Sequence, residues 1–139
     1  MSPAFIVDSS ITMAWCFLEE QTEATAKVRK RLDAEAATAP AIWLLEVTNV
    51  LFHAEKRGRI TPSLSSDFLE VLRKMTIEVD YDGAARCFEH VLPLCRRHDL
   101  TAYDAAYLEL AIRTGLPLAT LDGRLRAAAP AHGIELLGI

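Results

Sequence analysis

Residues 4–10 read AFIVDSS, an apolar run that stops at Asp8 and is followed by two serines. Four apolar residues in a row favour a buried strand, and a polar residue after a strand commonly caps the next helix. The pattern returns near the other end of the chain, where residues 118–122 read LATLD and the run stops at Asp122. Both stretches therefore predict a buried strand with an acid at its tip.

Working outward from these two stretches, strand and helix signals alternate along the chain. Gly58 and Gly115 end two helical patterns, and Thr61 with Pro62 has the form of a helix start. Pro93 falls inside a helical pattern and is expected to kink or split it. The expected strands are 4–8, 77–79, 118–121 and 134–137; the expected helices are 10–18, 22–36, 43–57, 61–76, 83–98, 102–114 and 123–129, with a Pro-bounded segment at Pro40.

Strands separated by helices predict a parallel sheet covered on both faces. We therefore expect a three-layer α/β/α sandwich with a short central parallel sheet of four or five strands, in a single domain over residues 1–139. The carboxyl ends of parallel strands lie along one edge, where open α/β sheets bind their ligands. If the first and the 118–121 strands are neighbours, Asp8 and Asp122 lie close together at that edge.

The composition narrows the class of protein. Of the 139 residues, 51% are apolar, and no apolar run approaches the roughly 18 residues of a membrane span. The net charge of −4 argues against broad, nonspecific nucleic-acid affinity but leaves room for a nuclease whose acids hold metal. The beginning of the chain lacks a signal-peptide pattern, and its three cysteines indicate reduced thiols, so we expect a cytoplasmic protein without a membrane partner.

Two further acids stand in helical patterns. Glu46 lies in residues 41–57, a helix that is apolar on most sides and is expected to be largely buried; its polar stripe continues through Asn49, His53 and Arg57. A carboxylate that faces such a core without a partner costs several kcal/mol, so Glu46 needs one. Asp104 follows Thr101 by three residues, which resembles a capping box.

A cation is the partner that would suit all four acids. No lysine falls at an expected strand tip, and two carboxylates in close contact repel by about 4 kcal/mol at an effective dielectric near 20. Oxygen ligands suit a hard ion, so the acids predict a Mg²⁺ or Mn²⁺ site. Ser9, or the serine after it, and Thr120 could add hydroxyl contacts.

Other hypotheses explain the acids differently. Each acid could be a helix cap in a non-catalytic α/β domain, since Asp8, Asp104 and Asp122 all precede or open expected helices. A phosphoacceptor domain also keeps acids at strand tips, but it needs an adjacent acid pair and a strand-tip lysine that this chain lacks. Removal of Asp8 tests the capping hypothesis, which expects a loss of only about 1 kcal/mol of stability, whereas a metal-dependent enzyme would lose its activity with the fold retained.

The order FIVDSS, PAIWLLEVTNVL, LTAYDAAYLELA and LATLDGRL resembles the PIN-domain ribonucleases, most closely the VapC-type toxins of bacterial toxin–antitoxin pairs. The resemblance covers nearly the whole chain. It implies a metal-dependent endoribonuclease that uses Mg²⁺ or Mn²⁺ and leaves 5′-phosphate and 3′-hydroxyl ends. The resemblance implies that the four acids of the family's active site correspond to Asp8, Glu46, Asp104 and Asp122. It also implies that the family's hydroxyl beside the last acid corresponds to Thr120, and that the polar residue which commonly accompanies the helix acid corresponds to Asn49.

The resemblance also implies partners. The substrate is RNA, with single-stranded loops as the expected target because their bases are free to be stacked and read. Arg57, Arg59 and Arg124 are the candidates for phosphate contact. A cognate antitoxin is expected to block the metal site, and a homodimer is expected to form through apolar helix faces, with residues 61–76 as the candidate.

Overall fold

A five-stranded sheet lies at the centre of the protein, whose computed structural model describes all of residues 1–139. All strand pairs are parallel, in the order β3-β2-β1-β4-β5. The strands are β1 (Pro3–Val7), β2 (Ala36–Pro40), β3 (Ile77–Asp80), β4 (Leu118–Ala119) and β5 (Leu136–Leu137). The chain is therefore a parallel α/β protein, as its alternating pattern predicts.

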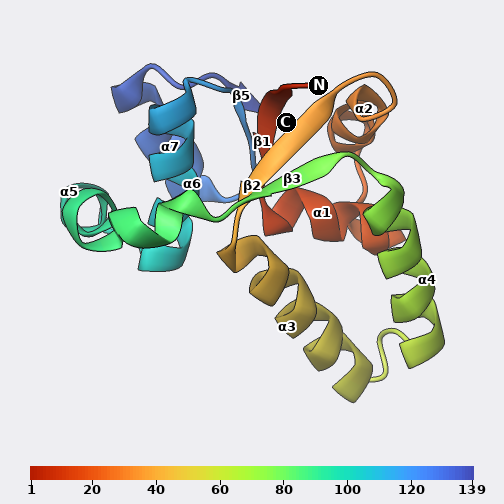
Figure 1. The fold of residues 1–139 in the computed structure, drawn as a ribbon. Helices are drawn as coiled ribbons and strands as arrows, with labels where there is room; N and C mark the ends of the chain where they lie inside the picture. The colour runs from red at the N-terminus through yellow and green to blue at the C-terminus, as the bar shows by residue number, and fades with distance from the viewer.

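Helices cover both faces of this sheet. Figure 1 shows α5, α6 and α7 on one side and α1, α2 and α4 on the other, with α3 and α4 extending together beyond the sheet. The α-helices are α1 (Ser9–Cys16), α2 (Glu23–Arg31), α3 (Ile42–Lys56), α4 (Pro62–Lys74), α5 (Leu92–His98), α6 (Ala102–Thr114) and α7 (Gly123–Ala128). Short 3₁₀ segments are η1 (Leu18–Glu20), η2 (Asp82–Arg86) and η4 (Ala129–His132). The three-layer prediction is confirmed, and no helix is both long and apolar enough to cross a membrane.

The two strands that end in acids are neighbours. Ile6 pairs with Leu118 and Val7 with Ala119, in parallel register. The chain order reverses here, since β2 and β3 lie on one side of β1 while β4 and β5 lie on the other. This is the topological switch point at which open α/β sheets form their ligand crevice.

Strand β2 is the element that the sequence pattern did not reveal. Residues 36–40 read AATAP and are all buried, yet they carry no run of β-branched or aromatic residues. The strand is defined by its neighbours: it pairs with β1 and β3, and the Thr38 hydroxyl donates to the Glu78 carbonyl at 2.8 Å. The charged helix expected to reach residue 36 consequently ends earlier, at Arg31.

The segment expected as one helix over residues 83–98 is divided, as Pro93 predicts. It begins with η2, passes through a π-helical turn η3 (Cys87–Val91), and becomes α-helical only from Leu92. Pro93 occupies the first turn of α5, where its missing N–H costs no intrahelical hydrogen bond. Thr61 likewise caps α4 by accepting from the Leu64 N–H at 3.2 Å.

Helix α3 is less buried than its apolar composition predicts, so that expectation is wrong. Only one face, which includes Trp43, Val47 and Leu51, packs into the core. Leu45 is 66% exposed and Phe52 is 54% exposed. The reason is tertiary: α3 extends beyond the strand ends, so its remaining faces have no layer to pack against (Figure 1).

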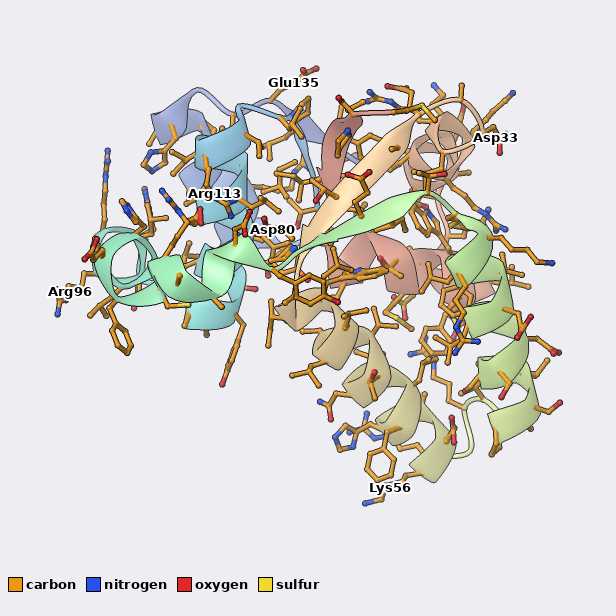
Figure 2. The ribbon with its side chains drawn as sticks, viewed as in Figure 1. Asp33, Lys56, Asp80, Arg96, Arg113 and Glu135 are labelled. Atoms are coloured by element: carbon orange, nitrogen blue, oxygen red, sulfur yellow. The ribbon has the colours of Figure 1, made fainter.

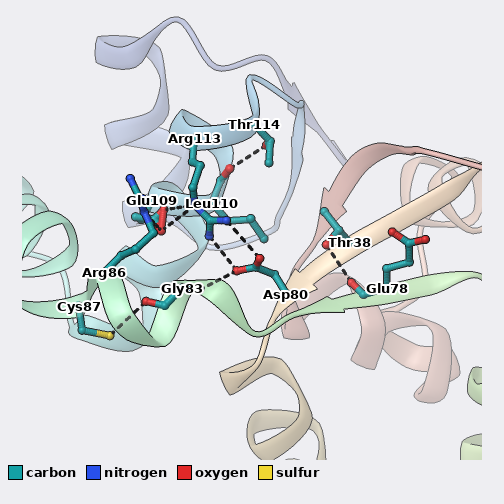
Figure 3. Close-up of polar contacts among 10 residues, drawn as sticks. All are labelled: Thr38, Glu78, Asp80, Gly83, Arg86, Cys87, Glu109, Leu110, Arg113 and Thr114. Atoms are coloured by element: carbon teal, nitrogen blue, oxygen red, sulfur yellow. Dashed lines mark hydrogen bonds and ion pairs between the residues drawn. The ribbon is translucent and has the colours of Figure 1, made fainter.

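An ionic cluster joins the end of β3 to α6 (Figure 3). The Arg113 guanidinium donates to both oxygens of Asp80, at 3.1 and 2.7 Å, and its Nε donates to Glu109 at 3.0 Å. Asp80 also accepts from the Gly83 N–H at 3.1 Å, while Arg86 Nε lies 3.3 Å from buried Glu109. The cluster fixes the helix that carries Asp104 against the edge of the sheet.

Candidate functional site

Asp8 follows β1 directly and is 3% exposed. It caps α1, because its Oδ1 accepts from the Ile11 N–H at 3.0 Å, and the same oxygen accepts from the Ser10 hydroxyl at 2.6 Å. Its Oδ2 accepts from the Thr120 hydroxyl. Asp8 is therefore a helix cap and also a buried acid that is bonded to the neighbouring strand tip.

The loop after β4 holds the second acid against the first. The Thr120 hydroxyl accepts from the Asp122 N–H at 3.0 Å, and Asp122 Oδ2 accepts from the Leu125 N–H at 2.9 Å as the cap of α7. Ser10 Oγ accepts from the Leu121 N–H at 2.9 Å. These bonds tie the two strand ends together, so the placement of Thr120 beside Asp8 follows from parallel pairing of β1 with β4.

Helix α3 is anchored over the tip of β1 by a chain of hydrogen bonds. The Trp43 indole N–H donates to the Thr12 hydroxyl at 2.9 Å, and that hydroxyl donates to the Asp8 carbonyl at 2.8 Å. Glu46 lies one turn further along α3 and is half-buried. The buried indole thus fixes the position at which the third acid enters the site.

Tyr107 is the partner of Glu46, and sequence reasoning missed it. Its hydroxyl donates to Glu46 Oε1 at 2.6 Å, while its side chain is almost wholly buried in α6. Burial and the Glu46 charge both raise the pKa of Tyr107, so the phenol keeps its proton and remains a donor. The available signal was helical spacing, because Tyr107 lies three residues after Asp104 and faces the same side of α6.

Asp104 lies in the first turn of α6. Thr101 caps this helix, because its hydroxyl accepts a hydrogen bond from the Asp104 N–H at 3.2 Å. This is one of the two hydrogen bonds of the predicted capping box. The carboxylate is half-buried, and the nearby Arg124 charge acts to lower its pKa. Among the predicted phosphate-contact residues, Arg124 is the one whose charge acts on the pKa of an acid in this cluster.

The acids form one electrostatic cluster. Burial is the largest cause that raises the pKa of Asp8, of Glu46 and of Asp104 above the ordinary carboxyl value. Their mutual charges act in the same direction: Asp122 raises the pKa of both Asp8 and Asp104, and Asp8 and Asp104 both raise that of Glu46. Glu46 is therefore influenced by two of the other acids, and Asp8 and Asp104 are each influenced by Asp122, although these side chains come from separate parts of the chain.

The donor set fits a hard divalent cation. None of the four acids forms an ion pair with a lysine or arginine, although the Arg124 charge acts on Asp104. No three carboxylate, imidazole or thiolate side chains stand close enough together to hold an ion directly. An ion held here would therefore bind at most two of these side chains directly, with water completing its coordination, as is usual for Mg²⁺.

The remaining predicted residues fall at different places. The Ser9 hydroxyl acts to lower the pKa of Glu46, which places it at the cluster. Asn49 and Arg57 are exposed along α3. Arg59 lies elsewhere: its guanidinium pairs with Glu19 at 2.7 Å and with Glu20 at 2.6 Å. Arg59 is therefore already occupied by two carboxylates.

Comparison with known proteins agrees with this fold. Residues 5–130 match the model of the PIN domain family. The curated relatives include ribonuclease VapC3 of Mycobacterium tuberculosis, 34% identical over 93% of this chain and 90% of that protein. They also include ribonuclease VapC3 of Pyrobaculum aerophilum, 29% identical over 91% of this chain and 95% of that protein.

A solved structure supports the same relationship. A crystal structure of a protein from Pyrobaculum aerophilum superposes with a TM-score of 0.70 at 25% identity, and the match covers 96% of this chain and 83% of the other. The family match spans most of the chain. The chain therefore belongs to the PIN-domain family, and within it to the VapC group.

Proposed function

We propose that this chain is a metal-dependent endoribonuclease that acts as the toxin of a toxin–antitoxin pair. The proposal is supported by the mutual electrostatic influence of carboxylates from separate segments, none of which forms an ion pair with a lysine or arginine. Relatives that match over nine-tenths of the chain are named ribonuclease VapC. PIN-domain ribonucleases of that group generally depend on a divalent metal, and Mg²⁺ or Mn²⁺ is the ion that these oxygen ligands favour.

In this mechanism Asp8 and Asp104 would anchor the principal ion, and Glu46 and Asp122 would hold water or a second ion. When bound, a divalent ion lowers the pKa of water and offsets the negative charge that develops on the phosphate and the leaving oxygen. The chain's own contribution is position. Thr120 and Ser10 fix Asp8 through their hydroxyl groups, and Tyr107 fixes Glu46.

Helix capping does not account for the whole cluster. Asp8 and Asp122 do cap α1 and α7, so the capping hypothesis describes two of the four acids correctly. Glu46 lies inside α3 and caps nothing, yet it is half-buried beside two other acids. Holding such a group near other negative charges is destabilising without a cation, which favours a metal site over a set of caps.

The proposal is tested with purified protein and RNA. We expect internal cleavage of single-stranded regions with Mg²⁺ or Mn²⁺, leaving 5′-phosphate and 3′-hydroxyl ends, and a loss of at least about 1,000-fold in rate in EDTA. The measurement is end-mapping of the cut sites. An Asp8→Asn chain purified in parallel controls for contaminating nuclease. Cleavage that persists in EDTA, or none with any divalent ion, contradicts the proposal.

Tyr107→Phe tests whether the buried phenol positions Glu46. We expect the rate at subsaturating Mg²⁺ to fall about tenfold and the Mg²⁺ requirement to rise, because groups that orient metal ligands commonly contribute this much. The lost hydrogen bond should cost about 1 kcal/mol of stability. The measurement is a Mg²⁺ titration of the cleavage rate, with exposed Tyr81→Phe as the matched control. An unchanged titration curve would show that Tyr107 supports packing only.

The partners follow from the same proposal. A cognate antitoxin inhibits the chain by occupying the acid cluster, and two copies associate through apolar helix faces. Leu64 is 55% exposed and Val71 is 41% exposed on α4, which supports the expected use of residues 61–76 as such a face. The three free cysteines and the RNA substrate are in keeping with a cytoplasmic location.

A further inference from the structure

A trough of about 570 Å³ adjoins the acid cluster on the outer side of α3. Glu46 forms part of its wall, together with Leu45, Asn49 and Phe52 of the same helix, and Tyr103 of α6 lines the wall as well. Its volume falls within the range of small-ligand sites, roughly 300–1,000 Å³. Because Glu46 belongs to both features, a molecule that lies in the trough also reaches the carboxylates.

Two exposed aromatic rings line this trough. Phe52 is 54% exposed and Tyr103 is 59% exposed, although both belong to well-formed helices. Tyr103 lines the trough together with Glu46, so its ring lies close to one of the four acids. Exposed aromatic faces are the usual platform on which proteins stack unpaired nucleic-acid bases.

Polar groups accompany the rings. Asn49 lies three residues after Glu46 and is exposed, so its amide presents one acceptor and two donors to whatever occupies the trough. Such a group can bind the edge of an unpaired base. The trough thus combines a surface for the flat face of a base with a group that distinguishes its edge.

Positive charge lies at the outer end of α3 and not at its inner end. Lys56 and Arg57 are both exposed, and neither forms an ion pair; Figure 2 shows Lys56 at the far tip of the helix. The Lys56 ammonium lies 5.5 Å from the Phe52 ring centroid. A strand that begins at the carboxylates and follows α3 outward would therefore pass two rings and an amide before its phosphates meet these cations.

We propose that this trough is the subsite for an unpaired RNA nucleotide next to the cleaved phosphate. The base stacks on Tyr103 and Phe52, Asn49 binds its edge, and Lys56 and Arg57, about 15 Å from Glu46 along α3, contact a phosphate of a later nucleotide in the strand. The inference rests on the proposed function, since it assigns the base contacts of that same nuclease site. RNA fits better than an apolar helix of a second copy, because the trough mixes flat rings with an amide and a carboxylate and ends in unpaired cations.

Binding is measured separately from cleavage. An Asp8→Asn chain in Mg²⁺ is titrated into a fluorescent single-stranded RNA of about eight nucleotides, a length typical of such sites. Adding Tyr103→Ala should weaken binding about tenfold, whereas Tyr103→Phe keeps the stacking face and should remain within about twofold. Phe88→Ala is the matched control, since Phe88 is 91% exposed and belongs to η3, away from the trough. In the otherwise native chain, Asn49→Ala should change the base preferred at the cut.

The outcomes separate the two proposals. If Tyr103→Ala binds RNA as tightly as Phe88→Ala while the native chain cuts RNA, the subsite is wrong and the nuclease stands. If the native chain cuts no RNA with any divalent ion, the nuclease fails, and the binding titration still decides whether the trough holds RNA. If Tyr103→Ala instead dissociates a dimer at unchanged RNA affinity, the occupant is a second copy and the subsite is overturned.

Discussion

Asp104→Asn is expected to lower the rate of RNA cleavage by at least about 1,000-fold, which corresponds to about 4 kcal/mol of transition-state stabilisation. The substitution keeps the size of the side chain and removes the charge that would anchor the ion. The backbone N–H of residue 104 still donates to Thr101, so the cap of α6 is preserved. Single-turnover cleavage at saturating Mg²⁺ measures the loss.

The same variant should be more stable than the native chain when metal is absent. Burial, and then the Asp122 charge, raise the pKa of Asp104, so the folded chain holds this proton more tightly than the unfolded chain does. Protonated Asp104 therefore stabilises the folded chain at low pH. This stabilisation is lost as the pH rises from the unfolded carboxyl pKa, about 3.9, through the higher pKa of the folded chain. In EDTA the melting temperature of Asp104→Asn should exceed that of the native chain increasingly over this window.

With divalent metal present, the native chain should have the higher melting temperature of the two. Binding to the folded state alone stabilises a protein by mass action, and the native chain has the complete set of ligands. Asp67→Asn is the matched control, because Asp67 is an exposed acid on α4. If Asp104→Asn retained more than about a tenth of the native rate, or if Mg²⁺ stabilised both chains equally, Asp104 would not be a metal-binding catalytic residue.

Arg113→Met is expected to lower the free energy of unfolding by about 3 kcal/mol, or about 10 °C in melting temperature. Arg113 joins Asp80 and buried Glu109, so its loss leaves two carboxylates with fewer partners inside the protein (Figure 3). The Arg113 hydrogen bonds are the largest cause that lowers the pKa of Asp80. Urea unfolding of the two chains measures the difference.

The pH dependence gives this prediction a second readout. A carboxyl whose pKa is lowered in the folded state stabilises the fold above its unfolded pKa, about 3.9, and loses that contribution as the pH falls through the folded value. The difference in free energy of unfolding between the native chain and Arg113→Met should therefore become smaller at acidic pH. Arg97→Met, an exposed arginine on α5, should change stability by less than about 0.5 kcal/mol. Equal losses for both variants would mean that the cluster adds nothing specific.

Much of the fold is local information. The runs before Asp8 and Asp122 identify two strands, Thr61 and Gly115 mark where helices begin and end, and Pro93 divides a helix. These signals can be read because capping, proline geometry and apolar periodicity act over a few residues. Strand β2 could not be recognised in this way, since its alanine-rich residues become a strand through pairing with β1 and β3.

The candidate site likewise combines features that the sequence predicts with features that only the tertiary structure reveals. Its four acids can be nominated from the sequence, because each interrupts or follows an apolar pattern and no lysine accompanies them. Their roles in catalysis stay predictions until they are tested. The contacts that position them required the tertiary structure: Tyr107 meets Glu46 across 61 positions of sequence, and Thr120 meets Asp8 across 112.

The sequence by itself determined most of the strands and helices, with the exception of β2, and it indicated the acids at two strand tips and their compatibility with a hard metal ion. Only the tertiary structure decided that β1 and β4 are neighbours, that α3 leaves Phe52 and Leu45 exposed, and that Arg59 is held by two glutamates. The physical reason is the sequence separation over which each interaction acts. Side-chain periodicity reports which face of an element is apolar, whereas the layer that covers this face is set by packing between segments far apart in the chain.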